Sequence, residues 1–68
     1  MANETIQVQG MSCQHCVSSV EGAVGGLDGV DTVNVHLQEG KVDVSFDEGK
    51  VKLNDITEAI EDQGYDVV

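Results

Sequence analysis

The sequence is poor in basic residues, aromatic residues and proline, and each shortage excludes a class of structure or function. Among its 68 residues there is no proline and no tryptophan, and phenylalanine and tyrosine occur once each. Only three lysines oppose thirteen acidic residues, so the formal net charge is -10. Such a charge repels phosphate groups and leaves no basic surface, so we expect no nucleic-acid binding.

Long hydrophobic segments are also missing. No apolar run approaches the ~20 residues of a membrane-spanning helix, so we expect no membrane insertion. The first four residues, Met1 to Glu4, have neither the basic start nor the apolar stretch of a secretory signal peptide. We therefore expect a cytoplasmic protein with a single domain, residues 1-68, whose core consists mainly of Val, Leu, Ile and Ala.

Periodic apolar residues predict a strand and then a helix in the first part of the chain. Ile6 and Val8 alternate with polar residues, which predicts a first strand that ends at Gly10. From about Gln14 the apolar residues recur three and four apart. This spacing predicts a helix that ends near residues 24–26, where glycines break helical order.

The second part of the chain predicts a hairpin, a helix and a closing strand. Alternating stretches at 33–37 and 42–46 predict two antiparallel strands joined at Glu39-Gly40, where glycine supplies the positive φ of a tight turn. A second helix is expected to end before Gly64 as its C′ residue, and residues 65–68 to form a short strand. The predicted apolar face of that helix consists of Leu53, Ile56, Ala59 and Ile60.

The βαββαβ order predicts an α+β protein with the ferredoxin-like sandwich. In this arrangement two helices cover one face of a four-stranded antiparallel sheet. The other face is expected to meet water, because a sheet covered on both faces would show continuous apolar runs instead of alternation. Since this topology serves many unrelated functions, the function must be sought in a particular site.

Cys13 and Cys16 are the only cysteines and form a Cys-x-x-Cys motif between the first strand and the first helix. The first turn of a helix presents unpaired N–H groups, which favour thiolates and should lower the pKa of at least one thiol. Thiolates prefer soft ions such as Cu(I), whereas a structural zinc site normally has four ligands. Two ligands on an exposed loop leave coordination positions open, so we also expect a copper-bridged homodimer.

Several other interpretations of the cysteine pair remain open. The pair could form a disulfide, although structural disulfides are uncommon in the cytosol and a short loop removes little chain entropy. It could consist of buried inert thiols, or serve thiol–disulfide exchange as in thioredoxins. The thioredoxin alternative is disfavoured because the chain lacks the Trp and Pro residues of that family. Other soft metals, such as Hg(II), remain an alternative cargo, with Zn(II) or Cd(II) as adventitious guests.

The two histidines are not expected to complete a metal site. His36 falls on the polar side of its predicted strand, which is typical of a solvated surface residue. His15 lies between the cysteines but projects to another side of the helical turn. We therefore expect His15 to tune the thiols electrostatically and not to bind the metal.

The chain resembles a known family over essentially its whole length. The resemblance rests on Gly10-Met11-Ser12-Cys13-Gln14-His15-Cys16, Leu27-Asp28-Gly29-Val30 and Asp62-Gln63-Gly64-Tyr65. These segments resemble the heavy-metal-associated (HMA) domain family, in particular its bacterial CopZ-type copper chaperones. The resemblance implies Cu(I) bound by Cys13 and Cys16. It further implies a carrier, not an enzyme, that delivers Cu(I) to the N-terminal metal-binding domains of a copper-exporting P-type ATPase.

The same resemblance implies roles for two residues beside the cysteines. Met11 is expected to be an apolar anchor beneath the loop and not a copper ligand, in keeping with the gap-filling use of methionine. Tyr65 is expected near the metal, where it could shield the ion. The family's domain also occurs as a module within copper ATPases. Here Met1 and the compact end at Val68 favour a free chaperone.

Overall fold

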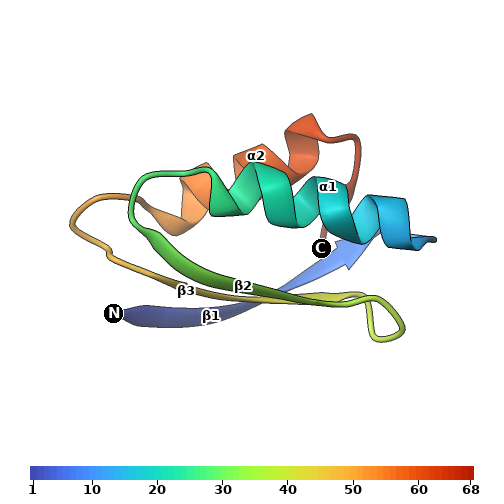
Figure 1. Ribbon diagram of the computed structural model, residues 1–68, viewed down its shortest axis with the longest axis horizontal. Helices are drawn as coiled ribbons and strands as arrows, with labels where there is room; N and C mark the ends of the chain where they lie inside the picture. The colour runs from blue at the N-terminus through green and yellow to red at the C-terminus, as the bar shows by residue number, and fades with distance from the viewer.

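A computed structural model describes residues 1–68 as two helices lying on one face of a four-stranded antiparallel sheet (Figure 1). The elements in chain order are β1 (Ala2–Gln9), α1 (Gln14–Gly25), β2 (Val30–His36), β3 (Lys41–Phe46), α2 (Leu53–Asp62) and β4 (Asp66–Val67). The predicted βαββαβ order and the ferredoxin-like fold class are confirmed. Neither helix is long and apolar enough to cross a membrane.

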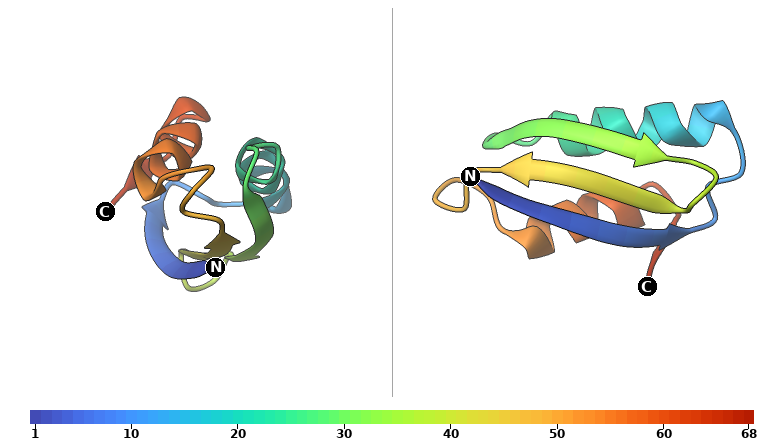
Figure 2. Two further views of the ribbon diagram at one scale, coloured as in Figure 1. Left: turned by 90° about the vertical axis from the view of Figure 1, so that its left-hand side faces the viewer. Right: turned by 90° about the horizontal axis from the view of Figure 1, so that it is seen from below.

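The sheet has the strand order β2-β3-β1-β4, so the two ends of the chain contribute neighbouring strands (Figure 2). In its central part Ile6 of β1 lies opposite Val42, and Val33 of β2 lies opposite Val44. Strand β4 is two residues long and pairs only with the end of β1. All pairings are antiparallel, as predicted.

The core lies between the helices and the covered face of the sheet. Ile56, Ile60, Val20 and Val24 from the helices are fully buried, and they meet Val42 of the central strand β3. Val and Ile therefore build the core as expected, while Leu27 and Ala59 only border it. Leu53 was predicted on the apolar face of α2, but it is 38% exposed. It is the first residue of α2, one turn before Ile56, where the buried face of that helix begins.

The predicted limits of two strands differ from the observed ones, and β2 begins at Val30, three residues before the predicted start. β2 ends at His36, and Leu37 lies in a turn that closes with a hydrogen bond of 2.9 Å from the Gly40 N–H to the His36 carbonyl oxygen. Residue Tyr65 was predicted to begin the closing strand, but it lies before β4, of which only Asp66 and Val67 pair with β1. The turn glycines were predicted correctly: Gly40 has φ +66°, and Gly64 has φ +95° directly after the C-cap of α2.

Candidate metal centre

The two cysteines lie at the start of α1, on the loop that connects it to β1. Cys13 is the N-cap residue of α1, with extended backbone, and its carbonyl oxygen accepts the N–H of Cys16 at 3.0 Å. Cys13 is exposed, Cys16 is half-buried, and both are free thiols. The interpretation as two buried inert thiols is therefore wrong for Cys13.

The two sulfur atoms are close enough to bind one ion. The Sγ atoms of Cys13 and Cys16 are 3.5 Å apart. Because a metal–sulfur bond is about 2.3 Å long, sulfur atoms separated by up to about 4.6 Å can share an ion. No group of three or more His, Cys, Asp or Glu side chains is placed to hold a metal anywhere in the chain. A metal site built on the cysteine pair would therefore have a low coordination number, which suits a soft monovalent ion better than zinc.

The loop before the cysteines owes its course to Gly10 and Met11. Gly10 has φ +102°, a conformation that side-chain-bearing residues rarely adopt, and it lies against the ring of Tyr65. Met11 is half-buried and packs on the hydrophobic core. This is the position expected of an apolar anchor for the loop. Tyr65 also packs on the core, so residues from both ends of the chain meet at the cysteines.

The surroundings of Cys16 favour its ionised form. Hydrogen bonding from the Tyr65 side chain, followed by the backbone of Ser12 and of Cys13, lowers the pKa of Cys16 to about 6. The same hydrogen bond raises the pKa of Tyr65, because an ionised tyrosine could no longer donate it. The expectation of at least one acidic thiol is confirmed. A share of the effect comes from backbone groups before the first helical turn, but the largest share comes from Tyr65.

His15 does not contribute to this effect. It is exposed on α1 and is not among the groups that lower the pKa of Cys16. The tuning role expected for His15 therefore stays a prediction without a supporting contact. Sequence analysis missed the backbone of Ser12, which lowers the pKa of Cys16 and leaves no signal in the sequence.

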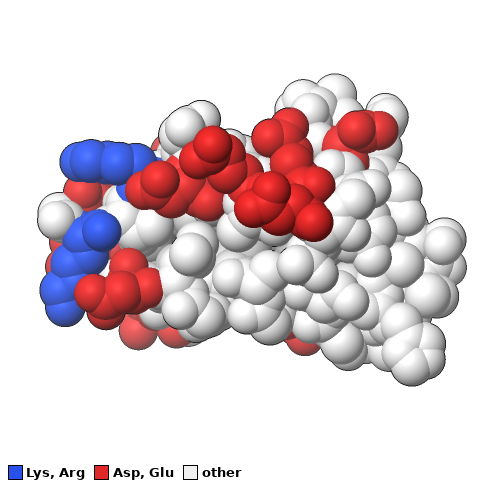
Figure 3. Space-filling model, turned by 90° about the horizontal axis from the view of Figure 1, so that it is seen from above, with Lys and Arg blue, Asp and Glu red and all other residues white.

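Charged side chains are distributed unevenly over the helical side of the molecule (Figure 3). On the helical side, acidic residues spread over the middle and lysines lie at one end (Figure 3). The opposite end, where α1 begins, shows no charged side chain in this view (Figures 1 and 3).

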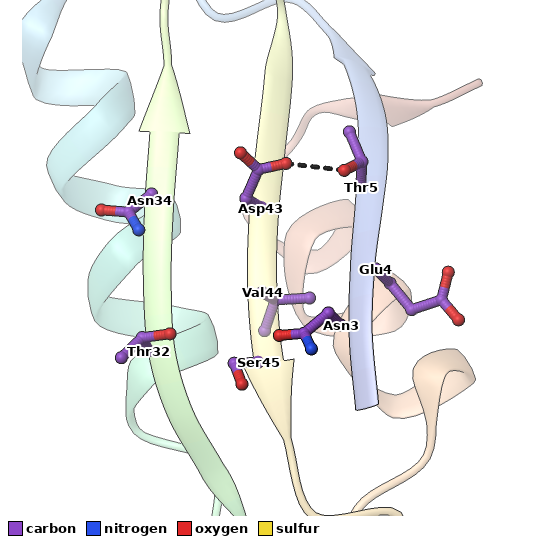
Figure 4. A pocket seen from close by; sticks show the side chains of 8 residues that line it. All are labelled: Asn3, Glu4, Thr5, Thr32, Asn34, Asp43, Val44 and Ser45. Carbon is purple, nitrogen blue, oxygen red and sulfur yellow. Dashed lines mark hydrogen bonds between the residues drawn. The ribbon is translucent and has the colours of Figure 1, made fainter. Parts of the chain in front are cut away.

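The uncovered face of the sheet carries polar side chains around a shallow hollow of about 380 Å³ (Figure 4). There Asp43 accepts a hydrogen bond of 2.7 Å from the Thr5 hydroxyl, and its other oxygen lies 2.9 Å from Nε2 of His36. The Thr5 contact, and then His36, lower the pKa of Asp43. His36 is thus on the polar face of the sheet, as predicted, and it pairs with a carboxylate there.

A family model described as the heavy-metal-associated domain matches residues 5–66. This chain belongs to the heavy-metal-associated domain family. The copper chaperone CopZ of Bacillus subtilis (strain 168) is 66% identical over 67 residues, which are 98% of this chain and 97% of that protein. The family resemblance inferred from the sequence is therefore confirmed.

Solved structures of the family share this fold closely. A CopZ metallochaperone superposes with a TM-score of 0.97 at 49% identity, covering 98% of this chain and all of that one. A copper-binding domain from HMA7, a P-type ATPase, superposes with a TM-score of 0.93 at 38% identity, covering 100% of this chain and 95% of that one. The same fold thus occurs both in small metallochaperones and in a domain of a P-type ATPase.

Proposed function

We propose that this protein is a cytoplasmic copper chaperone that binds Cu(I) through Cys13 and Cys16. The observation that carries the proposal is a pair of free thiols 3.5 Å apart on an accessible loop, in a chain of the heavy-metal-associated family. Free thiols of this kind require a reducing compartment. The whole chain, residues 1-68, acts as one such domain and carries the ion without catalysing a reaction.

The recipient in this proposal is a related N-terminal domain of a copper-exporting P-type ATPase. A P-type ATPase domain with the same fold supports this choice. Transfer proceeds by ligand exchange: a thiolate of the recipient binds the ion, three sulfur atoms hold it briefly, and one cysteine sulfur of this chain leaves. The number of thiolates is conserved, so no oxidant or reductant is needed. An accessible two-sulfur site makes this exchange feasible, whereas an enclosed site would retain the ion.

The central test is an anaerobic Cu(I) titration against a competing chelator, with native mass spectrometry as the readout. We expect one Cu(I) per chain at low loading. Cys13→Ser and Cys16→Ser should each weaken binding by more than about a hundredfold, since loss of a mere hydrogen-bonding partner of a ligand already costs about 10- to 100-fold. Ser18→Ala, at an exposed position of α1, is the matched control. Wild-type affinity in either serine variant would exclude the two-cysteine site.

The same samples test the copper-bridged homodimer. A two-coordinate ion on an exposed loop can accept thiolates from a second chain, so sedimentation should show a monomer without metal and a growing dimer fraction with added Cu(I). An unchanged monomer at full loading would contradict the bridge. It would leave the chaperone proposal to be decided by the affinities of the serine variants.

A thiol redox function is the second candidate, because a Cys16 pKa of about 6 would also suit thiol–disulfide exchange. The test is to oxidise the protein and measure disulfide exchange with a model substrate against a free dithiol. Faster exchange than the free dithiol, together with weak Cu(I) binding, would replace the chaperone proposal with this one.

A further inference from the structure

The first half of β1 lies on an open edge of the sheet. On one side β1 pairs with β3 along most of its length, but on the other side β4 pairs only with Val8 and Gln9. The N–H of Val68 adds one more hydrogen bond, to the carbonyl oxygen of Gln7. Figure 2 shows the same arrangement, in which β1 borders the sheet and the C-terminal segment meets only its end. Residues 2–6 therefore have a free side.

The free side carries backbone hydrogen-bonding groups of Asn3 and Thr5. In an antiparallel strand the N–H and C=O of one residue point to the same side, and successive residues alternate between the two sides. The N–H of Val8 bonds toward β3, to the Gly40 carbonyl oxygen at 2.8 Å, whereas the carbonyl oxygen of Gln7 bonds toward β4. Steps of two residues back from Gln7 place the N–H and C=O groups of Thr5 and Asn3 on the open side, in the row that β4 begins.

The opposite edge of the sheet is irregular, whereas this one is regular. Strand β2 forms the opposite edge, and its pairing with β3 shifts between Val30 and Thr32, beside the exposed Asp31. Bulges and charged side chains on an edge strand hinder the addition of another strand. The pairing of β1 with β3 has no such shift. The β1 edge is therefore the one suited to β-strand addition, in which an extended segment of another chain joins a sheet.

The side chains beside the open edge set the pattern that an added strand must match. On the helix-facing side Ile6 is buried in the core and Ala2 packs against it. Glu4 lies between them and is exposed, without a basic side chain in contact with it. Figure 4 shows the Glu4 side chain extending past β1, away from β3. A residue placed opposite Glu4 in an added strand would therefore meet an unpaired carboxylate.

We propose that the β1 edge, residues 2–6, binds an extended segment of a partner protein with the pattern apolar, polar, basic, polar, apolar. Paired antiparallel, as β4 is, this segment places its basic residue opposite Glu4 and its apolar residues opposite Ala2 and Ile6. Opposite charges directly across two strands stabilise a sheet, and like charges destabilise it. Two copies of this chain paired through β1 around Glu4 would bring two carboxylates together and double a net charge of -10, so a second copy is disfavoured.

This edge and the cysteines are separate sites. The metal-binding loop follows the other end of β1, so a strand added along residues 2–6 leaves the thiols accessible. The proposal therefore does not rest on the proposed function, and its test uses the metal-free protein.

Titration with short peptides, followed by NMR spectra of the backbone amides, tests the pairing. The probe is acetyl-Val-Thr-Lys-Thr-Val-amide, and its matched control carries Glu in place of Lys. At low ionic strength we expect the Lys peptide to bind about fivefold more tightly, with the largest shifts at residues 2–6 and slower exchange of the Asn3 and Thr5 amide protons. Methylation of both threonine nitrogens in the peptide should weaken binding about tenfold or more, because it removes the donors that face the Asn3 and Thr5 carbonyl oxygens.

Charge variants of the protein then test the role of Glu4. Glu4→Lys should reverse the preference, so that the Glu peptide binds more tightly, and Glu4→Gln should remove it. Glu21→Lys makes the same change of charge at an exposed position of α1 and should keep the preference for the Lys peptide.

Three results would overturn the proposal. The first is equal binding of the Lys and Glu peptides to the wild type, and the second is an unchanged preference in Glu4→Lys. The third is a shift of the Asn3 and Thr5 amide signals on dilution without peptide, which would show that a second copy occupies the edge. Because no copper is present, failure of the copper proposal would leave each of these outcomes unchanged.

Discussion

Cys16 and Tyr65 are 49 positions apart in the sequence, yet the phenol is the main reason that the thiol is acidic. A hydrogen bond to a thiolate stabilises the charged form, which lowers the pKa of the thiol. The two residues meet because Gly10 lets the loop turn beside the tyrosine ring and Tyr65 immediately precedes the short strand β4. At the scale of the residue, the site therefore consists of the cysteine pair and one phenol.

Tyr65→Phe should raise the pKa of Cys16 from about 6 toward the ordinary thiol value. Removal of the hydroxyl takes away the largest contribution, while the backbone groups of Ser12 and Cys13 remain. The measurement is the alkylation rate at Cys16 against pH, resolved by mass spectrometry of the peptides. His15→Ala is the comparison variant and should change the pKa of Cys16 less than Tyr65→Phe does, because His15 is not among the groups that lower it. A shift in His15→Ala with none in Tyr65→Phe would reverse the assignment.

The acidic thiol also predicts how stability depends on pH. Because the pKa of Cys16 is about 6 in the folded chain, below the unfolded value, its ionised form stabilises the fold. This contribution is complete above the unfolded pKa of about 8.5 and disappears as pH falls through the folded pKa. Urea denaturation should show the stability of the wild type relative to Cys16→Ser rising from pH 5.5 to pH 9, roughly the window these two values define. A constant difference across that range would contradict the shift.

At the scale of the element, a turn between two elements leaves less room for an added side chain than the exposed face of a helix does. Gly29, in the turn between α1 and β2, has φ +102°, and a Cβ there would lie 2.7 Å from the Cβ of Lys50. Gly22 in the middle of α1 has nothing within 4 Å of such an atom. The same substitution should therefore have opposite effects at these two positions.

Gly29→Ala should destabilise the protein by about 3 kcal/mol, which combines left-handed backbone strain with overpacking. Gly22→Ala should stabilise it by about 0.5–1 kcal/mol, since alanine favours the helix interior. Urea denaturation of both variants checks the signs. Both should still bind one Cu(I) per chain, because neither residue lies at the cysteines. Equal stability of the two variants would contradict the packing at Gly29.

At the scale of the whole molecule, the net charge of -10 lowers the stability that the small hydrophobic core provides. The structure contains one contact between a basic side chain and a carboxylate, His36 with Asp43, and both residues are exposed. Thirteen acidic residues therefore repel one another with little compensation, which destabilises the compact state. The charge also keeps separate chains apart, so self-association through other faces is opposed.

Salt should stabilise this protein. Raising ionic strength from about 0.01 to about 0.5 M shortens the screening length from about 30 Å to a few ångströms and so weakens the repulsion. We expect a higher thermal midpoint in sodium chloride, measured by circular dichroism at pH 7. Sucrose at equal osmolality controls for general solute effects. A lower midpoint in salt would show that attractive charge pairs outweigh the repulsion.

The sequence by itself determined the order of the elements, the Val and Ile core, the glycines at the turns and the cysteine pair at the start of a helix. These features are local, because each can be recognised within a few consecutive residues. They are the apolar periods of two and 3.6 residues, the positive φ of glycine and the Cys-x-x-Cys spacing. The family resemblance added the expectation that Tyr65 lies near the cysteine pair, but the local sequence pattern could not predict its effect on the thiols.

Only the tertiary structure decided which distant side chains meet. Sequence analysis assigned the tuning of the thiols to His15 because it is adjacent to them, whereas packing brings in Tyr65 from the other end of the chain. The pairing of His36 with Asp43 depends in the same way on the register of β2 with β3. The exposure of Leu53 depends on where α2 meets the sheet. Such contacts follow from how separate elements pack, and a pattern read along one element holds no information about its neighbour.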